Sequence, residues 1–397
     1  MQNPSRRKFL IRTAALGCSA AASPFITPMT FAAAPWDQRL VVIILRGAMD
    51  GLDVVRPVGD ANYAAYRPTL AGDVQSGTDL DGYFSLSPDL ARLAPLWQQG
   101  ELAFAHAVST PYRDKRSHFE GQDLLEAGTG MDVPFGAIKG GWLNRMLGQV
   151  PGVSARTAFA VGRSDMMVLD GAVPVSSWSP DARMDLSPSG KRLLQDIYHG
   201  DPLFQEAGNI ATELTAPLAG RGDVLSAGLG TSAGQMMKSM LGASKSSRAG
   251  ALARFAAEQL NQETRIAAFS IGGWDTHRGQ SRALKRALAE LGDAVLTLRE
   301  TLGPNWQNTA VLAMTEFGRT ARENGSGGTD HGTGGLMLMA GGAIRGGKIY
   351  GDWPGLGDAD LYQNRDLFPT TDVRDFAAQA MRGMFGLNRD MLEGVVF

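Results

Sequence analysis

Short, mostly apolar segments recur along the chain, and each is followed by a polar segment that contains glycine. Apolar segments of this length, without alternating polar positions, are typical of strands that are covered on both faces of a sheet. The clearest of them cover residues 40–45, 101–108, 265–271, 309–314 and 336–340, and shorter ones at 157–161 and 346–350 predict a further strand and an edge strand.

A helical pattern separates two of these predicted strands. Within 281–302, leucine or valine recurs at alternating spacings of four and three residues from Leu284 to Leu302, which indicates one buried stripe on a helix. Because this helix connects the strand at 265–271 with the strand at 309–314, the two strands are predicted to be parallel. Further helices are predicted to start at Ser87, Ser117, Gly141 and Thr370, the last ending near Gly386, and to occupy most of 191–260.

Strands and helices in this order predict a three-layer α/β/α sandwich with a mainly parallel central sheet. The predicted domain covers 35–397, and no shift in composition is sharp enough to mark another domain. Residues 163–190 are rich in Ser, Pro, Asp and Gly, so we expect a loop-rich cap within 163–250.

The first 34 residues carry the features of an export signal. The segment SRRKFL at 5–10 resembles the twin-arginine export motif, an apolar segment follows at 14–26, and Ala32-Ala33-Ala34 offers a cleavage site. We therefore expect export by the twin-arginine machinery and a periplasmic or secreted protein. The apolar segment is too short and too interrupted for a stable transmembrane anchor. A lipoprotein site at Cys18 is the alternative.

Charge and cysteine content exclude several classes of function. The chain of 397 residues has 38 basic and 40 acidic side chains, and a net charge of -2 argues against a nucleic-acid-binding surface. The single cysteine, Cys18, lies inside the predicted signal. The mature chain is therefore predicted to have no disulfide, no thiol nucleophile and no cysteine-ligated metal.

Acidic residues and histidines follow several of the predicted strands. Because the carboxyl ends of parallel strands meet at one edge of a sheet, we expect these side chains to gather there. Carboxylate and imidazole together suit zinc, manganese or iron, so the pattern predicts a divalent metal site. The alternative is that these residues form turns and hydrogen-bonded loops. The candidate ligands are Asp50, Asp275, His277, Glu316, Asp330 and His331, with Asp53 a weaker candidate.

A second candidate lies at the predicted start of a helix. Ser117 is followed three residues later by Glu120, which is the pattern of a capping box. The functional alternative is a nucleophile or an anion site, because a helix start offers free N–H groups and a positive dipole end. In that interpretation Ser117 is a nucleophile and His118 is a base or a ligand, while Arg113 and Arg116 bind phosphate or sulfate. His106, inside a predicted strand, is expected to be a core histidine.

Six short segments resemble one family when they are taken together. They are RGAMDGL at 46–52, SHFEGQ at 117–122, GGWDTH at 272–277, TEFGRT at 315–320, DHG at 330–332 and PTTDVR at 369–374. They are similar to the secreted, twin-arginine-exported family known as domain of unknown function number fifteen hundred and one, whose activity is not established.

The order of these segments also resembles, more distantly, the alkaline phosphatase and sulfatase superfamily. That resemblance implies an α/β/α fold and metal-assisted hydrolysis of phosphate or sulfate esters. It places Asp50 at the acid after the first strand, Ser117 at the hydroxyl nucleophile, and His331 at the last histidine. Where the superfamily has an Asp-His pair, this chain has Glu316-Phe317, so the resemblance does not imply a complete two-metal site.

The sequence thus predicts an exported metal-dependent hydrolase of phosphate or sulfate esters, with Ser117 or a coordinated water as the nucleophile. An alternative from another class is a cell-envelope binding protein that retains the fold and recognises an anionic polysaccharide. A third alternative is a purely structural role for the acids and histidines as loop contacts.

Overall fold

The computed structural model describes residues 37–73, 76–134, 137–162, 166–178 and 247–397. The predicted export signal at 1–34, with Cys18, lies outside the described residues, as does most of the predicted cap within 163–250. Of the helices predicted over 191–260, the described part contains α10, Arg248–Leu260.

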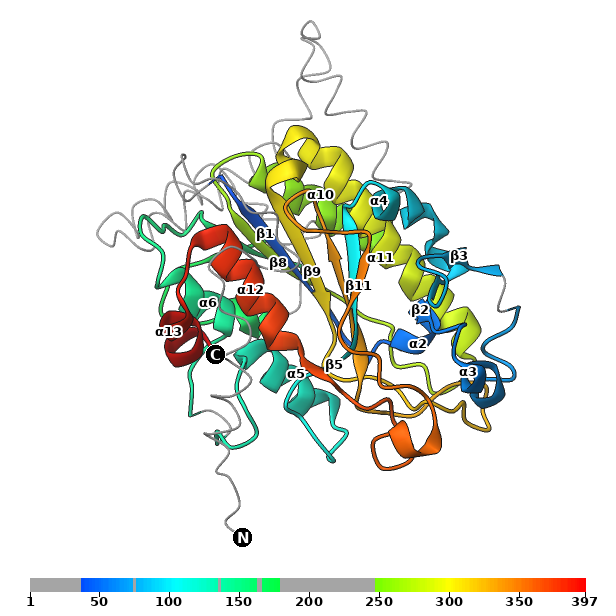
Figure 1. Ribbon diagram of the computed structural model, residues 1–397. Coiled ribbons are helices and arrows are strands. Elements are labelled where there is room, and N and C mark those ends of the chain that lie inside the picture. Colours follow the sequence, from blue (N-terminus) through cyan, green and yellow to red (C-terminus); the bar gives the residue numbers. More distant parts are fainter. Residues whose placement is uncertain (1–36, 74–75, 135–136, 163–165, 179–246) are drawn as a thin grey trace, which may run out of the picture.

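Nine of the described strands form one sheet, in the order β11-β5-β10-β9-β1-β8-β6-β7, with β12 paired to β5 (Figure 1). Along the chain they are β1 Arg39–Leu45, β5 Leu102–Ser109, β6 Ala158–Val161, β7 Ser176–Trp178, β8 Ile266–Ile271, β9 Thr309–Met314, β10 Gly335–Ala340, β11 Lys348–Tyr350 and β12 Thr371–Asp372. Among these strands, β10 alone runs antiparallel to its neighbours β5 and β9. The prediction of a mainly parallel sheet is confirmed.

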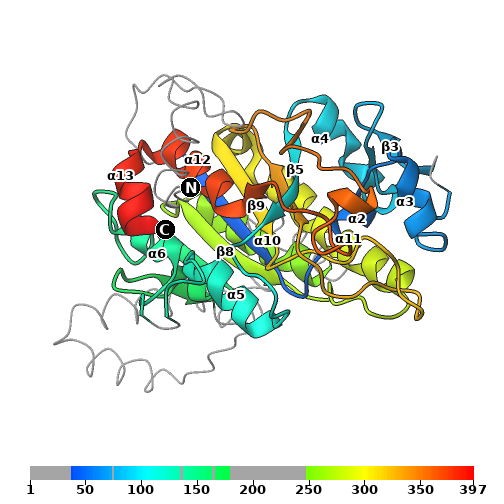
Figure 2. The same ribbon diagram turned by 60° about the horizontal axis from the view of Figure 1, so that its bottom comes forward.

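Helices cover both faces of the sheet. The helices α10 and α11 Gln280–Leu302 cover one face, and α6 Trp142–Leu147 and α12 Val373–Phe385 cover the other (Figures 1 and 2). On β1 the odd-numbered side chains from Val41 to Leu45 pack in one core with α10 and α11, whereas the even-numbered ones from Leu40 to Ile44 pack in another with α6 and α12. This alternation follows from the two-residue period of a strand. In the described residues the α-helices are α2 Gly51–Val54, α3 Ala61–Tyr66, α4 Ala94–Gln98, α5 His118–Ala127, α6 Trp142–Leu147, α10, α11 Gln280–Leu302, α12 Val373–Phe385 and α13 Arg389–Met391. The three-layer α/β/α sandwich is therefore confirmed.

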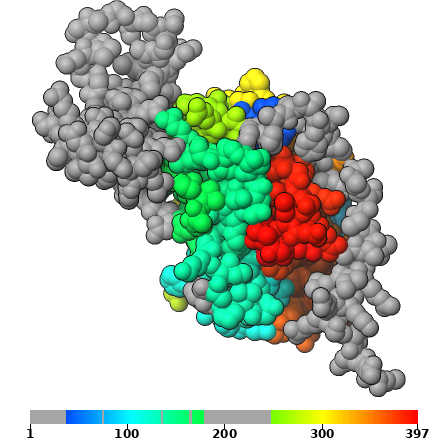
Figure 3. Space-filling view, turned by 90° about the vertical axis from the view of Figure 1, so that its left-hand side faces the viewer, coloured from blue at the N-terminus to red at the C-terminus, as the bar shows by residue number. Residues whose placement is uncertain are grey.

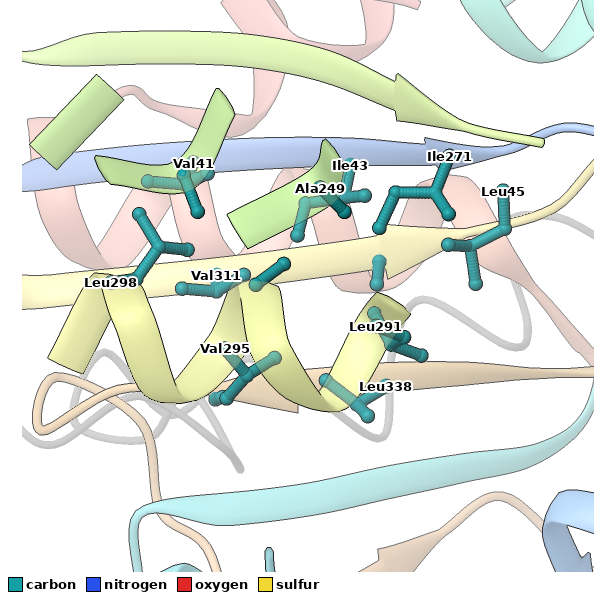
Figure 4. Packing of buried hydrophobic residues seen from close by; sticks show 14 of the residues in the cluster. Val41, Ile43, Leu45, Ala249, Ile271, Leu291, Val295, Leu298, Val311 and Leu338 are labelled. Carbon is teal, nitrogen blue, oxygen red and sulfur yellow. The ribbon is translucent and has the colours of Figure 1, made fainter. Parts of the chain in front are cut away.

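The long helix α11 has the buried stripe that its sequence predicts. Leu291, Val295 and Leu298 point from the helix toward the sheet, where Val311 of β9 and Leu338 of β10 face them (Figure 4). The helix connects β8 to β9, and both strands pair in parallel with β1 between them. The predicted crossover is confirmed.

The helix predicted from Ser87 is divided in the structure. A 3-10 helix covers Pro88–Leu93, and α4 follows from Ala94. Pro95 lies in the first turn of α4, and because proline has no N–H it cannot continue the hydrogen bonds of the preceding turn. A small sheet that the sequence analysis did not predict lies nearby, with the strands β2 Val55–Arg56, β3 Thr78–Asp79 and β4 Ser85–Leu86.

The C-terminal segment packs against α6. The rings of Trp142 and Phe397 lie 5.5 Å apart, and Arg145 Nε donates to the carbonyl of Val396 at 3.1 Å. Figure 3 shows this red C-terminal segment beside the green segment that contains α6. Among the helices that the structure describes, none has the length and apolar character needed to cross a membrane.

The directions of the strands decide which loops meet. The carboxyl ends of β1, β5, β8 and β9 lie at one edge of the sheet because these strands run in the same direction. The amino end of the antiparallel strand β10 lies at the same edge. Loops from five strands therefore converge there.

Candidate metal centre

Three of the five histidines in the chain meet one aspartate at this edge of the sheet. Asp275 and His277 follow β8, His118 begins α5 after β5, and His331 precedes β10. Candidate ligand atoms of His118, Asp275 and His331 lie within 4.8 Å of one another. Segments that are far apart in the sequence thus bring together the residue types of a metal site.

The ring atoms of the three histidines face the carboxylate of Asp275. Its Oδ1 lies 3.1 Å from His277 Nε2 and 3.3 Å from His331 Nε2, and its Oδ2 lies 3.5 Å from His118 Nε2. The Nε2 atoms of His277 and His331 are 2.9 Å apart. All four side chains are partly exposed, so the cluster is accessible from solvent.

The opposite nitrogen of His118 contacts Glu316, which is fully buried. His118 Nδ1 lies 2.8 Å from Glu316 Oε1, which also accepts from the backbone N–H of Gly47 and from Gln122 Nε2, while Thr315 Oγ1 donates to Oε2. Burial acts to raise the pKa of Glu316, but the hydrogen bonds from His118, Gln122 and Thr315 outweigh it and hold the pKa below its ordinary value. An ionised Glu316 can only accept, so His118 donates through Nδ1 and directs Nε2 at Asp275.

The other two histidines are oriented in the same way. His277 Nδ1 lies 3.2 Å from Asp330 Oδ1, and His331 Nδ1 lies 3.0 Å from the backbone carbonyl of Arg116. Burial acts to raise the pKa of Asp330, but hydrogen bonds from Asn324 and His277 hold it below its ordinary value. Both Nδ1 atoms therefore donate to oxygen acceptors, which leaves both Nε2 atoms as acceptors.

Arg319 fixes the charge of Asp275. The Arg319 side chain is fully buried, and its Nη1 donates to Asp275 Oδ1 at 2.9 Å. Partial burial acts to raise the pKa of Asp275, but the hydrogen bond and the charge of Arg319 outweigh it and hold the pKa below its ordinary value. The carboxylate that faces the histidines is therefore ionised at neutral pH.

The close approach of two loops at this place requires a glycine. Gly47, directly after β1, has a φ of +121°, and a Cβ built on it would lie only 2.6 Å from the backbone nitrogen of Asp275. A side chain here would push the segment that carries Asp275 away from the end of β1.

These contacts fit a bound divalent cation. Three imidazole nitrogens face one ionised carboxylate, and His118 Nε2 is buried without a hydrogen-bond partner. Burial lowers the pKa of His331, which favours a neutral ring, whereas the hydrogen bond to Glu316 raises the pKa of His118, so a metal at His118 Nε2 would displace the proton that this contact favours. Histidines that bind metals usually donate their other N–H to a carboxylate or a carbonyl, as all three do here. Nitrogen and oxygen ligands of this kind suit zinc, manganese or iron.

The structure places Asp50 in a different environment. Both of its oxygens accept from Arg67, at 2.7 and 3.0 Å, and Gln280 Nε2 donates to Asp50 Oδ2 at 2.5 Å and to Asp53 Oδ2 at 2.8 Å. All four side chains are buried, and burial raises the pKa of Asp53. The structure therefore does not bring Asp50 or Asp53 to the histidines.

Ser117 and Arg113 are occupied by other contacts. Ser117 is the N-cap of α5, and its Oγ accepts from the backbone N–H of Glu120 at 3.5 Å. The guanidinium of Arg113 donates to three oxygens of the turn at 109–112. Burial lowers the pKa of Arg113. Arg116 has an exposed side chain and contributes its carbonyl to His331.

Phe317 forms an apolar wall beside the histidines. Its ring stacks on His118 with centroids 5.2 Å apart and on Tyr112 with centroids 5.9 Å apart, and it lies 5.2 Å from the ring of His331. The Glu316-Phe317 pair thus presents its carboxylate to one nitrogen of His118 and its ring to the face of the same imidazole.

Three side chains at the site, those of Arg319, Gln122 and Gln280, have contacts that were not predicted from sequence. Arg319 and Gln122 belong to the segments TEFGRT and SHFEGQ, and Gln122 follows His118 by four residues, which places both on one face of α5. That spacing is a signal for a shared contact. Gln280 begins α11 without any sequence signal for its contacts. His106, in contrast, is buried with Nε2 3.0 Å from the carbonyl of Val55, and the prediction of a core histidine is confirmed.

Several solved structures are similar to this chain at low identity. Ps i-CgsB in complex with k-i-k-neocarrahexaose has 11% identity and a TM-score of 0.37, with 89% of this chain and 73% of that chain covered. The C-terminal periplasmic domain of EcEptC from Escherichia coli, in complex with Zn, has 9% identity and a TM-score of 0.34, with 81% and 77% covered. A variant of TAB5 alkaline phosphatase with Mg bound has 12% identity and a TM-score of 0.37, with 92% and 100% covered. Values this low assign no activity to the chain.

Sequence comparison gives the family more directly. No curated protein matches the chain. The model of one family, described as "Protein of unknown function (DUF1501)", matches residues 107–396, which include α5 and the loops that carry Asp275 and His331. The chain belongs to the DUF1501 family.

Proposed function

We propose that this protein is an exported metal-dependent hydrolase of phosphate or sulfate esters. One observation carries the proposal. The Nε2 atoms of His118, His277 and His331 face the ionised carboxylate of Asp275, while each Nδ1 is held by an oxygen on the other side of its ring. Such an arrangement is stabilised by a cation among the four side chains.

The chain supplies the ligands and holds them in place. His118, His277, His331 and Asp275 would bind the metal, which when bound supplies Lewis-acid chemistry at an ester oxygen and lowers the pKa of water. Glu316 and Asp330, predicted as ligands from sequence, hold the Nδ1 protons of His118 and His277 in this proposal. Arg319 holds Asp275 ionised, so that the carboxylate can bind a cation.

The class of substrate rests on two considerations. A cationic centre stabilises the negative charge that develops on an ester oxygen, so an anionic ester is a suitable substrate. The order of the motifs resembles that of the alkaline phosphatase and sulfatase superfamily, which hydrolyses such esters. Export rests on the twin-arginine segment at 5–10 and the cleavage site at 32–34.

Elemental analysis of mature protein from the periplasm tests the metal. We expect stoichiometric zinc, manganese or iron in the wild type and its loss in the His277→Ala/His331→Ala variant. His106→Gln is the matched control, because His106 is a buried histidine that contacts the carbonyl of Val55 and lies outside the cluster. We expect this variant to retain the metal. Absence of metal from the wild type, under conditions without chelators, would remove the proposal.

A panel of phosphate and sulfate esters, screened with the metal bound, tests the activity. We expect turnover that is lost when Asp275 and His331 are replaced by alanine. Turnover that survives these replacements would place the chemistry elsewhere in the chain.

A second candidate function is a binding protein of the cell envelope that recognises an anionic polysaccharide. The contacts of Ser117 and Arg113 favour it, since the predicted nucleophile caps a helix and the predicted anion-binding guanidinium is occupied by the turn at 109–112. Metal content does not separate the two candidates. Ligand binding without turnover would favour the binding protein, and turnover would exclude it.

A further inference from the structure

Gln280, the first residue of α11, lies between the two loops that carry the candidate metal ligands. Its side chain is fully buried. Its Oε1 accepts from Thr276 Oγ1 at 2.9 Å and from Thr329 Oγ1 at 2.7 Å. Its Nε2 donates to the carboxylates of Asp50 and Asp53. An amide has two donor hydrogens and two acceptor lone pairs, so the hydrogen-bonding capacity of this side chain is fully used.

Thr276 connects this amide to the first loop. It stands between Asp275 and His277, and neighbouring side chains on extended backbone point in opposite directions. The exposures agree with this alternation, because Thr276 is 1% exposed whereas the side chains of Asp275 and His277 are 47% and 40% exposed. Holding the hydroxyl of Thr276 inward therefore directs both flanking side chains outward to the metal centre.

Thr329 connects the amide to the second loop. It directly precedes Asp330 and His331, and its hydroxyl accepts from Arg319 Nε at 3.2 Å while it donates to Gln280. Arg319 in turn donates to Asp275. The backbone N–H of Thr329 also donates to the carbonyl of Thr276 at 3.3 Å. The two loops are thus joined at their buried sides as well as through their histidines.

We propose that Gln280 is a positioning residue that sets the distance between the loop with Asp275 and His277 and the loop with His331. Asp50 and Asp53 anchor the amide, and the two threonine hydroxyls transmit its position to the ligands. This inference rests on the proposed metal centre. Its physical basis is that buried hydrogen bonds behind metal ligands orient them and increase affinity for the metal.

Removal of the Thr276 hydroxyl tests the inference without leaving buried carboxylates unpaired. We compare Thr276→Val, which removes the hydroxyl, with Thr276→Ser, which keeps it. Two quantities are measured, the affinity for zinc in competition with a chelator and the ring signals of His277 and His331 in long-range proton–nitrogen NMR spectra of the metal-free protein. We expect Thr276→Val to weaken zinc binding about 10- to 100-fold and to shift both ring signals. We expect Thr276→Ser to restore both.

Thr301→Val is the matched control. Thr301 lies on α11, the helix that begins with Gln280, and its Oγ1 is buried without a hydrogen-bond partner. Removal of this hydroxyl should therefore change neither the zinc affinity nor the ring signals. Wild-type zinc affinity and unchanged ring signals in Thr276→Val would overturn the positioning role and leave the metal centre intact. A loss that Thr276→Ser does not restore would also overturn it. If the wild type binds no metal but the ring signals shift in Thr276→Val and return in Thr276→Ser, the positioning role stands and the proposed function falls.

Discussion

Two groups of charged and polar side chains lie close to the same edge of the sheet, and their hydrogen bonding differs. The closed cluster consists of Asp50, Asp53, Arg67 and Gln280. The open cluster consists of His118, His277, His331 and Asp275. In the closed cluster each carboxylate accepts from donors inside the protein. In the open cluster three ring nitrogens face a carboxylate, and His118 Nε2 has no hydrogen-bond partner.

The difference shows that a carboxylate after a buried strand does not by itself predict a metal site. Asp50 and Asp275 follow the neighbouring parallel strands β1 and β8. Arg67, from the segment after α3, gives Asp50 a buried ion pair, whereas Asp275 meets imidazoles that arrive from three loops. The side chains that contact each carboxylate therefore decide whether its charge is already neutralised inside the protein or is available to bind a cation.

The largest predicted effect is the loss of stability when the closed cluster loses the charge of Arg67. Arg67→Met would leave Asp50 and Asp53 buried without their cation, and breaking a buried ion pair typically costs about 3–5 kcal/mol. We expect a loss of stability of this size in urea unfolding. Arg322→Met is the control, because Arg322 pairs with Asp358 in an exposed position, so this variant should lose much less stability. Equal losses in the two variants would contradict the distinction between the clusters.

His106 differs from the histidines of the open cluster, because its ring is buried and contacts the carbonyl of Val55. Burial lowers its pKa from 6.5 to about 4. Between these values the unfolded chain binds a proton that the folded protein excludes, so stability is fully present above pH 6.5 and is lost as the pH falls toward 4. The loss amounts to about 3 kcal/mol. We expect His106→Gln to reduce this dependence in unfolding free energies measured between pH 4 and 7. A wild type and a variant with the same slope would contradict a neutral, buried His106.

Local pattern was sufficient to predict much of the fold. The strand Thr309–Met314 and the helix that ends at Leu302 each depend on apolar residues that are close in sequence, and both appear where predicted. The predicted helix from Ser87 differs from the structure at 88–93, because Pro95 in the first turn of α4 has no N–H to continue the hydrogen bonds of the preceding turn. A strand or helix whose apolar pattern lies within one segment is therefore predictable from that segment alone.

The site was predictable only in part. Asp275, His277 and His331 lie together, as expected from strand ends that share one edge. The contacts of Asp50 were not predictable, since they depend on Arg67, 17 residues later, and on Gln280, 230 residues later. Both partners are ordinary surface residue types in sequence, and only tertiary packing buries them.

Zinc should stabilise the open cluster and leave the closed one unchanged. At a free concentration 100 times its dissociation constant, a ligand that binds only the folded protein adds about 2.7 kcal/mol to the free energy of unfolding. We expect this gain in the wild type and its absence in His118→Ala, measured by urea unfolding with and without zinc. Ser117→Ala is the neighbouring control, since it loses a helix cap but should keep the full gain from zinc. A gain that persists in His118→Ala would exclude this ring from the metal site.

The smallest predicted effect is a weaker metal affinity when Glu316, which contacts the candidate ligand His118, loses its charge. Glu316→Gln keeps an oxygen near His118 Nδ1 but removes the buried charge, and such a change typically weakens metal affinity about 10- to 100-fold, or about 1.4–2.7 kcal/mol. Glu120→Gln is the matched control, because Glu120 lies in the first turn of α5, as His118 does, but its carboxylate is exposed and contacts Lys115. Complete loss of metal in Glu316→Gln would indicate that Glu316 is itself a ligand, as the sequence analysis predicted. A modest, measurable loss would indicate instead that the buried carboxylate acts through His118, so that the open cluster depends on a closed contact behind it.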